Sequence, residues 1–326
     1  MSLFFVTGAT GFVGRQVVET LRRGGHRVRG LGRDWSAAGP GHGVERIRGD
    51  LLDSRCYEDA VRDADAVLHV AGLLSARRRE HYVRTNVDGT RALFDACVRT
   101  GSKARVVIVS SIAAMGPRHD GRPIRESDPC RPRTEYGMSK LEAECVAREY
   151  SGRVPVVILR PTFIHGAGDT QGPEHVRLLL DPGRESRRTD VRTMSFCHVE
   201  DVARCVLRAA EADVPSGEGY LVAEPTSYDW DSVGAALREA FLSLLRAGEI
   251  EDGHAARVAL ERLERLDSIL IRGSRPDDWA CDTSKAEAEL AFRAALPLRE
   301  GAREAVRAYA ASARSEPLVA HDVGEA

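Results

Sequence analysis

The chain has 326 residues, with 47 basic and 49 acidic side chains and a formal net charge of -2 at pH 7. Its length exceeds the roughly 250 to 300 residues at which a single hydrophobic core stops growing, so we expect one main domain and a smaller one. The nearly balanced charge excludes the strong positive field that gathers nucleic acid or an anionic membrane surface, and we expect neither partner.

The apolar segments and the cysteines indicate a soluble protein of the cytoplasm. The longest apolar runs, such as Val106–Val109 and Val154–Leu159, have the length of strands and fall far short of the roughly 20 residues of a membrane span. No basic region precedes Leu3–Val6, so we interpret this segment as a first strand and not as a signal peptide. The seven cysteines have irregular spacing without a C-x-x-C pair, which favours reduced thiols, and we expect neither a disulfide frame nor a metal site.

The first half of the chain alternates short apolar segments with amphipathic helices. This alternation is typical of a parallel sheet that helices cover on both faces. The predicted strands span residues 3–7, 27–31, 44–48, 66–70, 104–110 and 154–159, and predicted helices follow the first strand and span residues 80–99 and 135–150. We therefore predict an α/β fold, a Rossmann-type doubly wound parallel sheet with a smaller C-terminal substrate-binding lobe.

The alternation breaks after Arg160 and Pro161. A loop-rich stretch to about residue 193 suits a segment that closes over a ligand. Order resumes with a predicted helix at 199–212, a short strand near 219–222 and helices near 229–246, 253–270, 284–292 and 299–314. We assign residues 1–160 with 194–212 to a dinucleotide-binding domain and residues 161–193 with 213–314 to the substrate-binding lobe, and we expect residues 315–326 to form a disordered tail.

A glycine-spaced turn, with Gly8, Gly11 and Gly14, lies between the first strand and the helix after it. Glycine permits the tight turn and the close approach of a pyrophosphate to the backbone, and the helix N-terminus offers free N–H groups and a partial positive charge. The context of strand and helix predicts that the phosphates of a dinucleotide bind here. The alternative is a strand-to-helix turn without a ligand.

The end of the second strand bears on the choice between NAD and NADP. An acidic residue at this position selects NAD, whereas the chain reads Leu31-Gly32-Arg33-Asp34. If the strand ends at Leu31, then Gly32 takes the selecting position and Arg33 meets a 2′-phosphate, so NADP(H) is favoured. A different register would bring Asp34 there and favour NAD(H), and Arg33 would then be an ordinary solvated cation.

Tyr136 and Lys140 lie four residues apart in a predicted helix and therefore share one of its faces. An ammonium beside the phenol would favour the phenolate and lower a pKa that is ordinarily about 10. Only three of the 47 basic residues are lysine, which adds weight to Lys140. Ser110 and Ser111 close the fifth strand at its carboxyl end, where one hydroxyl could contact a substrate carbonyl and where a plain strand-end turn is the alternative.

With these motifs the sequence resembles the extended short-chain dehydrogenase/reductase family, which includes nucleotide-sugar epimerases and dehydratases, 3β-hydroxysteroid dehydrogenases and dihydroflavonol reductases. The resemblance covers nearly the whole chain. It includes an ordered series of further motifs: Gly49-Asp50-Leu51, Asn86-Val87-Asp88-Gly89-Thr90, Val109-Ser110-Ser111 with Gly116, Arg160-Pro161, His198-Val199-Glu200-Asp201-Val202 and Asp282-Thr283-Ser284-Lys285-Ala286.

The resemblance implies a catalytic group of three residues. Ser111 lies five residues before Gly116 and well upstream of Tyr136, as the catalytic serine of the family does. Carried over, Ser111 orients the carbonyl, Tyr136 is the acid or base, and Lys140 lowers the pKa of that tyrosine and holds the nicotinamide ribose. The cofactor contacts expected in all are Gly8, Thr10, Gly11, Phe12, Val13, Gly14, Arg33, Asp50 and Leu51 at the adenine, Ala71, Asn86, Tyr136, Lys140, Pro161, Thr162 and Phe163.

Three departures from the family pattern bear on the substrate. Sugar-nucleotide dehydratases of the family carry an Asp-Glu pair where this chain has Ile112 and Ala113. Many sugar-nucleotide members have a diphosphate-binding Asn where this chain has Phe163, and a Tyr often stands at the position of Met115. Ile112, Met115 and Phe163 would make an apolar pocket mouth, with His165 in the pocket wall. The alternative is that they are core or cofactor-side residues that carry no information on the substrate.

The resemblance, closest to the 3β-hydroxysteroid dehydrogenase and dihydroflavonol reductase branch, implies an NAD(P)-dependent oxidoreductase. We expect it to interconvert a ketone and a secondary alcohol on a small, fairly apolar substrate. The alternatives are a nucleotide-sugar 4-epimerase with tightly bound NAD and a non-catalytic NADP(H)-binding sensor. The resemblance also implies a homodimer through the helices at 80–99 and 135–150.

Overall fold

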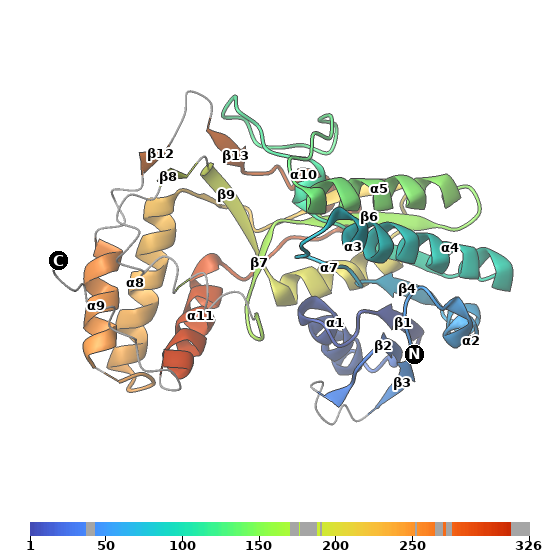
Figure 1. Ribbon diagram of the computed structural model, residues 1–326, viewed down its shortest axis with the longest axis horizontal. Coiled ribbons are helices and arrows are strands. Elements are labelled where there is room, and N and C mark those ends of the chain that lie inside the picture. The colour runs from blue at the N-terminus through green and yellow to red at the C-terminus, as the bar shows by residue number, and fades with distance from the viewer. Residues whose placement is uncertain are drawn as a thin grey trace.

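The computed structural model of the protein describes residues 1–36, 43–169, 176, 188–189, 191–251, 253–264, 270–271 and 276–313. A parallel sheet in the order β10-β6-β5-β4-β1-β2-β3 forms the main body (Figure 1). All six residues of β6 are buried, as expected for a strand covered on both faces. The seven strands are β1 (Leu3–Thr7), β2 (Arg27–Gly32), β3 (Val44–Arg48), β4 (Ala66–His69), β5 (Arg105–Val109), β6 (Val156–Pro161) and β10 (Glu218–Val222).

Helices cover both faces of this sheet, and each face has its own apolar core. On one face α1 (Phe12–Arg23) packs against α7 (Val199–Glu211), and α10 (Ser284–Leu290) adds to the same core. On the other face lie α2 (Glu58–Asp63), α4 (Gly89–Thr100) and α5 (Glu135–Tyr150). Short turns complete this body: η2 (Ser54–Cys56), α3 (Arg79–Tyr82), the π-helical η3 (Val83–Asp88) and η4 (Ile112–Ala114).

A second body, the lobe, lies beside the carboxyl edge of the sheet (Figure 1). Its core joins α8 (Trp230–Arg246), α9 (His254–Glu264) and α11 (Leu298–Ala313). A small sheet in the order β11-β9-β13 flanks it, with β7 also paired to β9. These short strands are β7 (Phe163–His165), β9 (Val191–His198), β11 (Ser227–Tyr228) and β13 (Asp277–Trp279), and a separate pair joins β8 (Arg188–Thr189) to β12 (Leu270–Ile271). None of the described helices combines the length and the apolar character that a membrane crossing needs.

The fold class predicted from the sequence is confirmed, and the differences lie in the second half. The sequence predicted a loop-rich stretch to residue 193, but residues 191–198 form β9. The start of this strand was missed because polar residues interrupt its apolar ones. The helix predicted over 253–270 ends at Glu264, and residues 270–271 are extended. The division at residue 213 is wrong for β10, which pairs with β6 in the main sheet. The predicted tail at 315–326 lies outside the described residues.

Candidate active site

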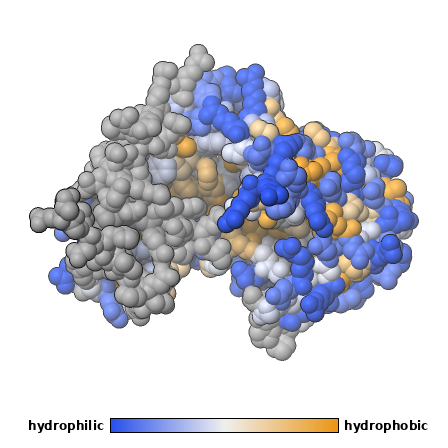
Figure 2. Space-filling model, in the orientation of Figure 1, coloured by the Kyte–Doolittle hydropathy of each residue, from blue (hydrophilic) through white to orange (hydrophobic). Residues whose placement is uncertain are grey.

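A cavity of about 1360 Å³ lies between the sheet and the lobe. It lies at the carboxyl edge of the parallel strands, where α/β proteins bind their ligands. Figure 2 shows apolar residues gathered in the hollow at the middle of the molecule. The cavity is lined by these predicted site residues: Gly8, Thr10, Gly11, Phe12, Val13, Gly14, Arg33, Asp50, Leu51, Ala71, Ser111, Ile112, Tyr136, Lys140, Pro161, Thr162, Phe163 and His165.

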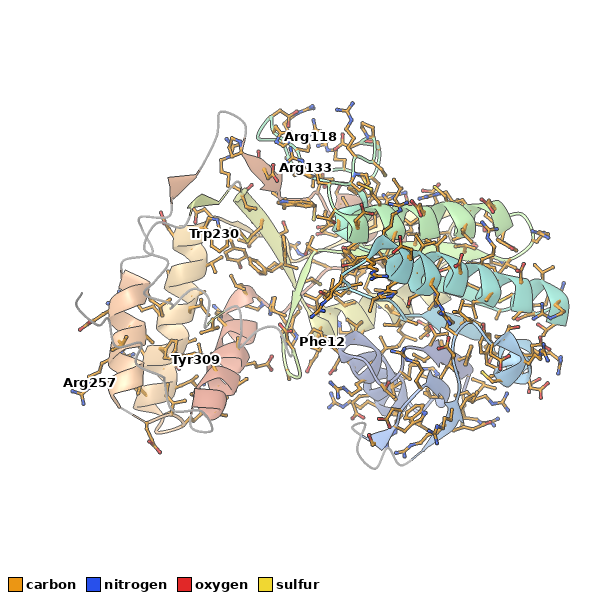
Figure 3. All side chains as sticks on the ribbon, viewed as in Figure 1. Phe12, Arg118, Arg133, Trp230, Arg257 and Tyr309 are labelled. Atoms are coloured by element: carbon orange, nitrogen blue, oxygen red, sulfur yellow. The ribbon has the colours of Figure 1, made fainter. Side chains whose placement is uncertain are left out.

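In the glycine turn after β1, the positions of Gly8 and Gly14 have no space for a side chain. Gly8 has a φ of +67°, and a Cβ there would lie 2.7 Å from the backbone of Ala71. A Cβ on Gly14 would lie 2.0 Å from the Gly8 carbonyl oxygen. Gly11 stands at the N-cap of α1 and has no side chain to cap it, so the first N–H groups of the helix are open to an anion. Phe12 begins the helix on the side that faces the lobe (Figure 3), and the turn fits the pyrophosphate of a dinucleotide.

The end of β2 brings a glycine and an arginine to the cavity. Gly32 is the last residue of β2, one residue later than predicted, and a Cβ there would lie 2.7 Å from Thr10 Cγ2. Arg33 is exposed and lines the cavity, and Arg48 of β3 stands opposite Gly32 in the sheet. Asp34 does not line the cavity.

The carboxylate of Asp34 is engaged elsewhere. It accepts hydrogen bonds from the backbone N–H of Ser36 at 2.8 Å and from its hydroxyl at 2.9 Å. These bonds hold the pKa of Asp34 below its ordinary value. Because the Asp34 carboxylate binds within its own loop, Arg33 is the charged residue directly after β2 that lines the cavity.

The structure brings Ser111, Tyr136 and Lys140 together at the ends of β5 and α5. Ser111 follows β5, and its hydroxyl oxygen accepts a hydrogen bond from Ala113 N at 3.1 Å. Tyr136 lies in the first turn of α5, where the hydroxyl oxygen of Thr134 caps the helix by accepting from Gly137 N at 3.0 Å. Burial raises the pKa of Tyr136, and a hydrogen bond with Ser111 opposes part of this rise.

Lys140 lies one turn further along α5 and is 6% exposed. Its ammonium donates a hydrogen bond to the carbonyl oxygen of Val109, at 2.7 Å, rather than to the phenol of Tyr136. Burial lowers the pKa of Lys140 to about 8, and Glu144 in the next turn opposes this shift. The pKa of Tyr136 is thus raised here and not lowered, because its burial outweighs the hydrogen bond with Ser111.

Asn86 does not line the cavity, in contrast to its predicted place among the cofactor contacts. Its Oδ1 accepts from Leu73 N at 2.7 Å, and its Nδ2 donates to Leu73 O at 3.1 Å and to Ser139 Oγ at 2.9 Å. The side chain is 2% exposed. Asn86 therefore fixes the loop after β4, whose residues do line the cavity.

A buried histidine that the sequence analysis missed supports the same loop. His69 ends β4, and its ring nitrogens lie 2.8 Å from Thr7 Oγ1 and 2.9 Å from Thr90 Oγ1. Thr7 in turn accepts from Ala71 N at 3.2 Å. Burial and the nearby Lys140 lower the pKa of His69 to about 3, so the ring is neutral. In the sequence, the position of His69 at the end of an otherwise apolar strand was the signal that could have identified it.

Met115, predicted at the pocket mouth, lies in the core instead. It is 2% exposed and packs with Ile112, Ile124 and Leu221 in a small apolar cluster. Cys130 Sγ lies 3.5 Å from its sulfur. Ile112 is also buried in this cluster, yet it borders the cavity. The alternative of a core residue therefore holds for Met115.

Aromatic rings and small apolar residues form the lobe side of the cavity. Phe163 is 42% exposed, and its ring lies 5.9 Å from that of Phe196 and 6.3 Å from that of Trp279. Both neighbours line the cavity as well. Besides His165, the remaining described contributors from the lobe are Ile164, Gly166, Ala167, Gly168, Asp169, Val176, Val233, Leu237, Leu298, Gly301, Ala302, Glu304, Ala305 and Ala308.

His165 lies in this wall as predicted, and its environment is closed. The side chain is 9% exposed, and neither ring nitrogen has a hydrogen-bond partner in the described part of the chain. A Cβ on Gly301 of α11 would lie 1.7 Å from its Nδ1. Burial, with a smaller effect of His198, lowers the pKa of His165 to about 3, so a neutral ring packs against α11.

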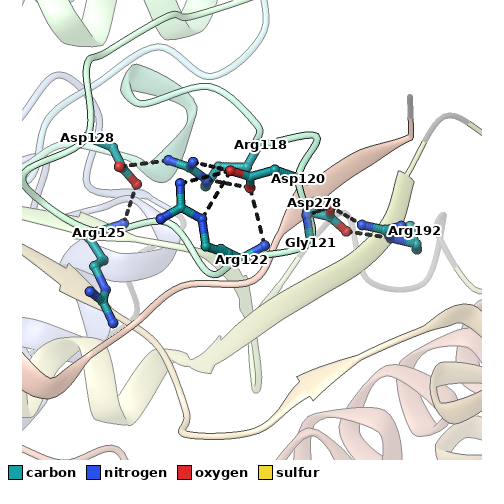
Figure 4. Close-up of polar contacts among 8 residues, drawn as sticks. All are labelled: Arg118, Asp120, Gly121, Arg122, Arg125, Asp128, Arg192 and Asp278. Carbon is teal, nitrogen blue, oxygen red and sulfur yellow. Dashed lines mark hydrogen bonds and ion pairs between the residues drawn. The ribbon is translucent and has the colours of Figure 1, made fainter. Parts of the chain in front are cut away.

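The loop that leads from Ser111 to Tyr136 contacts strand β13 of the lobe, and Figure 4 shows the ion pairs within the loop and within the lobe beside this contact. Arg192 of β9 binds Asp278 of β13, and the backbones of Arg118 and Asp278 pair with each other. Arg133 binds Asp277 at 2.6 Å, and both Arg118 and Arg133 lie on this loop at the top of Figure 3. The lobe therefore contacts the segment that immediately precedes Tyr136.

No group of three or more histidine, cysteine or acidic side chains stands in a metal-binding arrangement within the described ranges. The geometry thus combines a turn for phosphates, a hydroxyl pair beside a buried ammonium, and an apolar wall. Together they suit hydride transfer between a nicotinamide and a carbonyl carbon, with a proton moved at the oxygen.

Comparisons with known proteins agree with this geometry. Residues 4–223 match the model of the NAD dependent epimerase/dehydratase family. The chain is 32% identical over 284 residues to a 4-hydroxy-2-methyl-3-oxo-4-farnesyl-3,4-dihydroquinoline-1-oxide ketoreductase of Stigmatella aurantiaca, with 83% of this chain and 82% of that protein covered. It is 34% identical over 225 residues to sterol demethylase protein B of Methylococcus capsulatus, with 67% and 68% covered.

Among solved structures, MoeE5 in complex with UDP-glucose and NAD superposes with a TM-score of 0.72 at 25% identity, covering 96% of this chain and 99% of that one. The family model spans most of the chain, including the glycine turn, Ser111, Tyr136 and Lys140. The chain therefore belongs to the NAD dependent epimerase/dehydratase family, within the extended short-chain dehydrogenases/reductases, whose members are NAD-dependent dehydrogenases, reductases and epimerases.

Proposed function

We propose that the protein is an NADP(H)-preferring oxidoreductase that interconverts a ketone and a secondary alcohol on a fairly apolar small molecule. The observation that carries the proposal is the meeting of Ser111, Tyr136 and Lys140 with the glycine turn in one cavity. The bound nicotinamide would supply or accept the hydride at the carbonyl carbon.

The three residues divide the proton transfer among them. Ser111 holds the carbonyl oxygen by a hydrogen bond, and Tyr136 gives its phenolic proton to that oxygen during reduction. In oxidation Tyr136 takes the proton from the alcohol, so charge and atoms balance in both directions. Lys140 carries a positive charge into a buried site, where it stabilises the phenolate that remains after Tyr136 has donated.

The preference for NADP(H) is supported by the end of β2. Gly32 brings no carboxylate to the end of the strand, Arg33 lines the cavity, and Arg48, which does not line it, is a second cation opposite Gly32 in the strand pair. Asp34, the residue that could select NAD, has its carboxylate bonded to Ser36. An arginine at this place can pair with the two negative charges of a 2′-phosphate.

The apolar substrate is supported by the lobe side of the cavity. Asp169 and Glu304 are the ionisable side chains among the described lobe residues that line it, apart from the neutral His165, and both are acidic. A diphosphate would meet a carboxylate there and no described cation, which makes a nucleotide sugar a poor fit to this wall. The ketoreductase of Stigmatella aurantiaca acts, by its name, on a farnesylated quinoline oxide, a largely apolar ketone.

A nucleotide-sugar 4-epimerase is the second candidate, because MoeE5 holds UDP-glucose and NAD on the same fold at 25% identity. Such an enzyme would use the same three residues and regenerate its nicotinamide in every cycle. Phe163, where the resemblance expects a diphosphate-binding asparagine, disfavours it.

We further propose that the lobe binds the substrate. We also propose that α4 and α5 form a homodimer interface, and sedimentation analysis tests whether the protein is a dimer.

The deciding experiment follows NADPH absorbance with purified protein and a panel of ketosteroids, polyketide ketones and flavanones. We expect net oxidation of NADPH with at least one of them, slower turnover with NADH, and loss of turnover in Tyr136→Phe. Tightly retained NAD without net consumption would favour the epimerase. Undiminished turnover in Tyr136→Phe, or inactivity across the panel, would contradict the proposal.

A further inference from the structure

Glu144 is a fully buried carboxylate one helical turn beyond Lys140 on α5. Its Oε1 accepts hydrogen bonds from the Ser110 hydroxyl at 2.6 Å and from Arg160 Nε at 2.9 Å. Its Oε2 accepts from Arg160 Nη2 at 2.7 Å and from Arg148 Nη1 at 3.2 Å. An apolar residue of similar volume is often as stable as a buried ion pair, so stability alone does not account for this group.

Glu144 belongs to a row of contacts between α5 and the end of β5. Tyr136, Lys140 and Glu144 follow one another at four-residue steps and so share one face of the helix. Each of three consecutive residues at the strand end binds one of them: Val109 O binds Lys140, Ser110 binds Glu144, and Ser111 binds Tyr136. A slide of α5 along the strand would break all three contacts at once.

The same carboxylate also holds the neighbouring strand. Ser110 N donates to the carbonyl oxygen of Leu159 in β6 at 2.7 Å, and Arg160 is the next residue of that strand. The paired hydrogen bonds from Arg160 are of the bidentate type, which fixes geometry as well as charge. Glu144 therefore joins α5 to the carboxyl ends of β5 and β6, where the cavity opens.

The charges around Lys140 give Glu144 a second effect. Lys140 faces Tyr136 and Glu144 on its own helix, the neutral His69 on β4, and Arg160 on β6 behind the carboxylate. Without Glu144, Lys140 would lose the carboxylate that raises its pKa, and Arg148 and Arg160 would lose the anion that they share, although Arg160 would keep the attraction of Glu126. Burial already favours the uncharged amine, so Lys140 would then release its proton more readily.

We propose that Glu144, together with Ser110 and Arg160, is a positioning residue for proton transfer: it holds Ser111 and Tyr136 in register and keeps Lys140 charged. The inference rests on the proposed function, because it assigns the proton transfer to Tyr136. Its two parts, geometry and charge, are separable by two substitutions. Ser110→Ala removes the tie and keeps the charge, whereas Glu144→Gln removes the charge.

The scarcity of lysine makes the charge of Lys140 directly measurable. Protein labelled with [ε-13C]lysine has three side-chain signals, from Lys103, Lys140 and Lys285, and Lys→Arg variants at 103 and 285 assign the third. We expect Lys140 to titrate near pH 8 in the wild-type chain. In Glu144→Gln its pKa should fall by about 1 pH unit, because a neighbouring anion is gone.

Glu142→Gln is the matched control for this titration. Glu142 lies on the same helix, is exposed and binds Arg79 at 2.6 Å on the outer side. The same change of charge and shape there should leave the titration of Lys140 where it is in the wild-type chain. A fall of equal size in both variants would mean that the effect is not specific to Glu144.

Turnover in the direction of reduction is the second readout. We expect Glu144→Gln to lower kcat about 10-fold at pH 8 and less at pH 6, where Lys140 is protonated again, with KM for NADPH little changed. Ser110→Ala should lower kcat about 3-fold at every pH and leave the titration of Lys140 unchanged. A purely structural role would instead give a loss that is independent of pH.

An unchanged Lys140 titration in Glu144→Gln, or a kcat ratio that stays constant from pH 6 to pH 8, would overturn the charge role. Wild-type kcat in Ser110→Ala would overturn the positioning role of the hydrogen bond between Ser110 and Glu144. This variant tests the proposal if Glu144→Gln does not fold. The titration needs no turnover. If the Lys140 pKa falls in Glu144→Gln but the protein reduces no carbonyl, the proposed function is contradicted and the charge role of Glu144 is not.

Discussion

The two walls of the cavity are built in different ways. The wall on the sheet side carries the polar groups of the site, and short hydrogen bonds fix it: Lys140 in the wall binds Val109, and behind the wall Asn86 binds Leu73 and Glu144 binds Arg160. The wall on the lobe side consists of rings and small side chains, and the nitrogens of His165 have no partner among the described residues.

The difference separates two tasks. Proton and hydride transfer need atoms fixed to within a fraction of an ångström, and a hydrogen-bonded wall provides this. Binding of a substrate by apolar surface needs shape and area but little direction. We therefore expect substitutions on the sheet side to act on kcat or on the cofactor, and those on the lobe side to act on the KM of the carbonyl substrate.

The largest effect should come from Tyr136→Phe, which removes the proposed acid and leaves the ring in place. We expect kcat to fall by about 1000-fold or more, because general acid catalysis contributes on this scale. NADPH affinity should stay near the wild-type value in a fluorescence titration. Tyr150→Phe makes the same change at the far end of α5, where the hydroxyl binds Asp95, and should leave kcat unchanged.

Gly14→Ala tests the phosphate turn of the same wall. The new Cβ would lie 2.0 Å from the Gly8 oxygen, so the turn must shift. We expect the Kd for NADPH, measured by calorimetry, to rise about 100-fold. Gly152→Ala is the control, because a Cβ there meets nothing within 4 Å. Unchanged NADPH binding in Gly14→Ala would show that the pyrophosphate lies elsewhere.

Phe163→Asn probes the lobe side, where a polar amide would replace an exposed ring. We expect the KM for an apolar ketone to rise about 20-fold through lost apolar contact, with a smaller change in NADPH affinity. Val98→Asn, at an exposed apolar residue that does not line the cavity, should leave both constants unchanged. A fall in kcat at constant KM would erase the distinction between the two walls.

Arg33→Ala tests the cofactor preference with an effect of about 10-fold. Loss of a charge-assisted pair should raise the Kd for NADPH by that factor and leave the Kd for NADH unchanged. Arg27→Ala, at the other end of the same strand, is the control. Equal losses for both nucleotides would count against a 2′-phosphate contact at Arg33.

The smallest effect concerns stability, at Glu224 beside α11. Burial raises the pKa of Glu224 to about 7, although Tyr228 donates to its Oε2 at 2.8 Å. Between the ordinary value near 4.5 and pH 7 the folded chain therefore holds a proton that the unfolded chain has released, so stability falls as the pH rises through this range.

Glu224→Gln should remove that fall, and with it about 1 to 2 kcal/mol of the difference in unfolding free energy between pH 5 and pH 8. Urea denaturation at the two pH values measures it. Glu239→Gln, on α8 and exposed, serves as the control. An unaltered pH dependence in Glu224→Gln would mean that the carboxylate is already ionised at pH 5.

The sheet side of the cavity was largely predictable from the sequence. Gly8, Ser111, Tyr136 and Lys140 stand in motifs with fixed spacing, and the alternation of strands and helices determines that these motifs meet at one edge. What was missed there depends on pairing across the fold. Glu144 and Arg160 are 16 residues apart, and no local pattern shows that they bind.

The lobe side was not predictable in the same way. Its strands β7, β11 and β13 have two or three residues each, too few for any periodicity. Whether Met115 faced the cavity or the core depended on Ile124, nine residues further along an irregular loop, and on Leu221, which arrives from β10. His165 lies in the cavity wall as predicted, but neither nitrogen of its ring has a described partner, so its contacts assign it no chemical role.

The ion pair between Arg133, on the loop before Tyr136, and Asp277 of β13 has a consequence for how the enzyme responds to ionic strength. Arg133 is partly exposed, whereas the cores of the main body and of the lobe are apolar. Attraction between such charges weakens as ionic strength rises, and apolar burial does not. Added salt would thus weaken the contact between the lobe and the loop before Tyr136 while leaving each body folded.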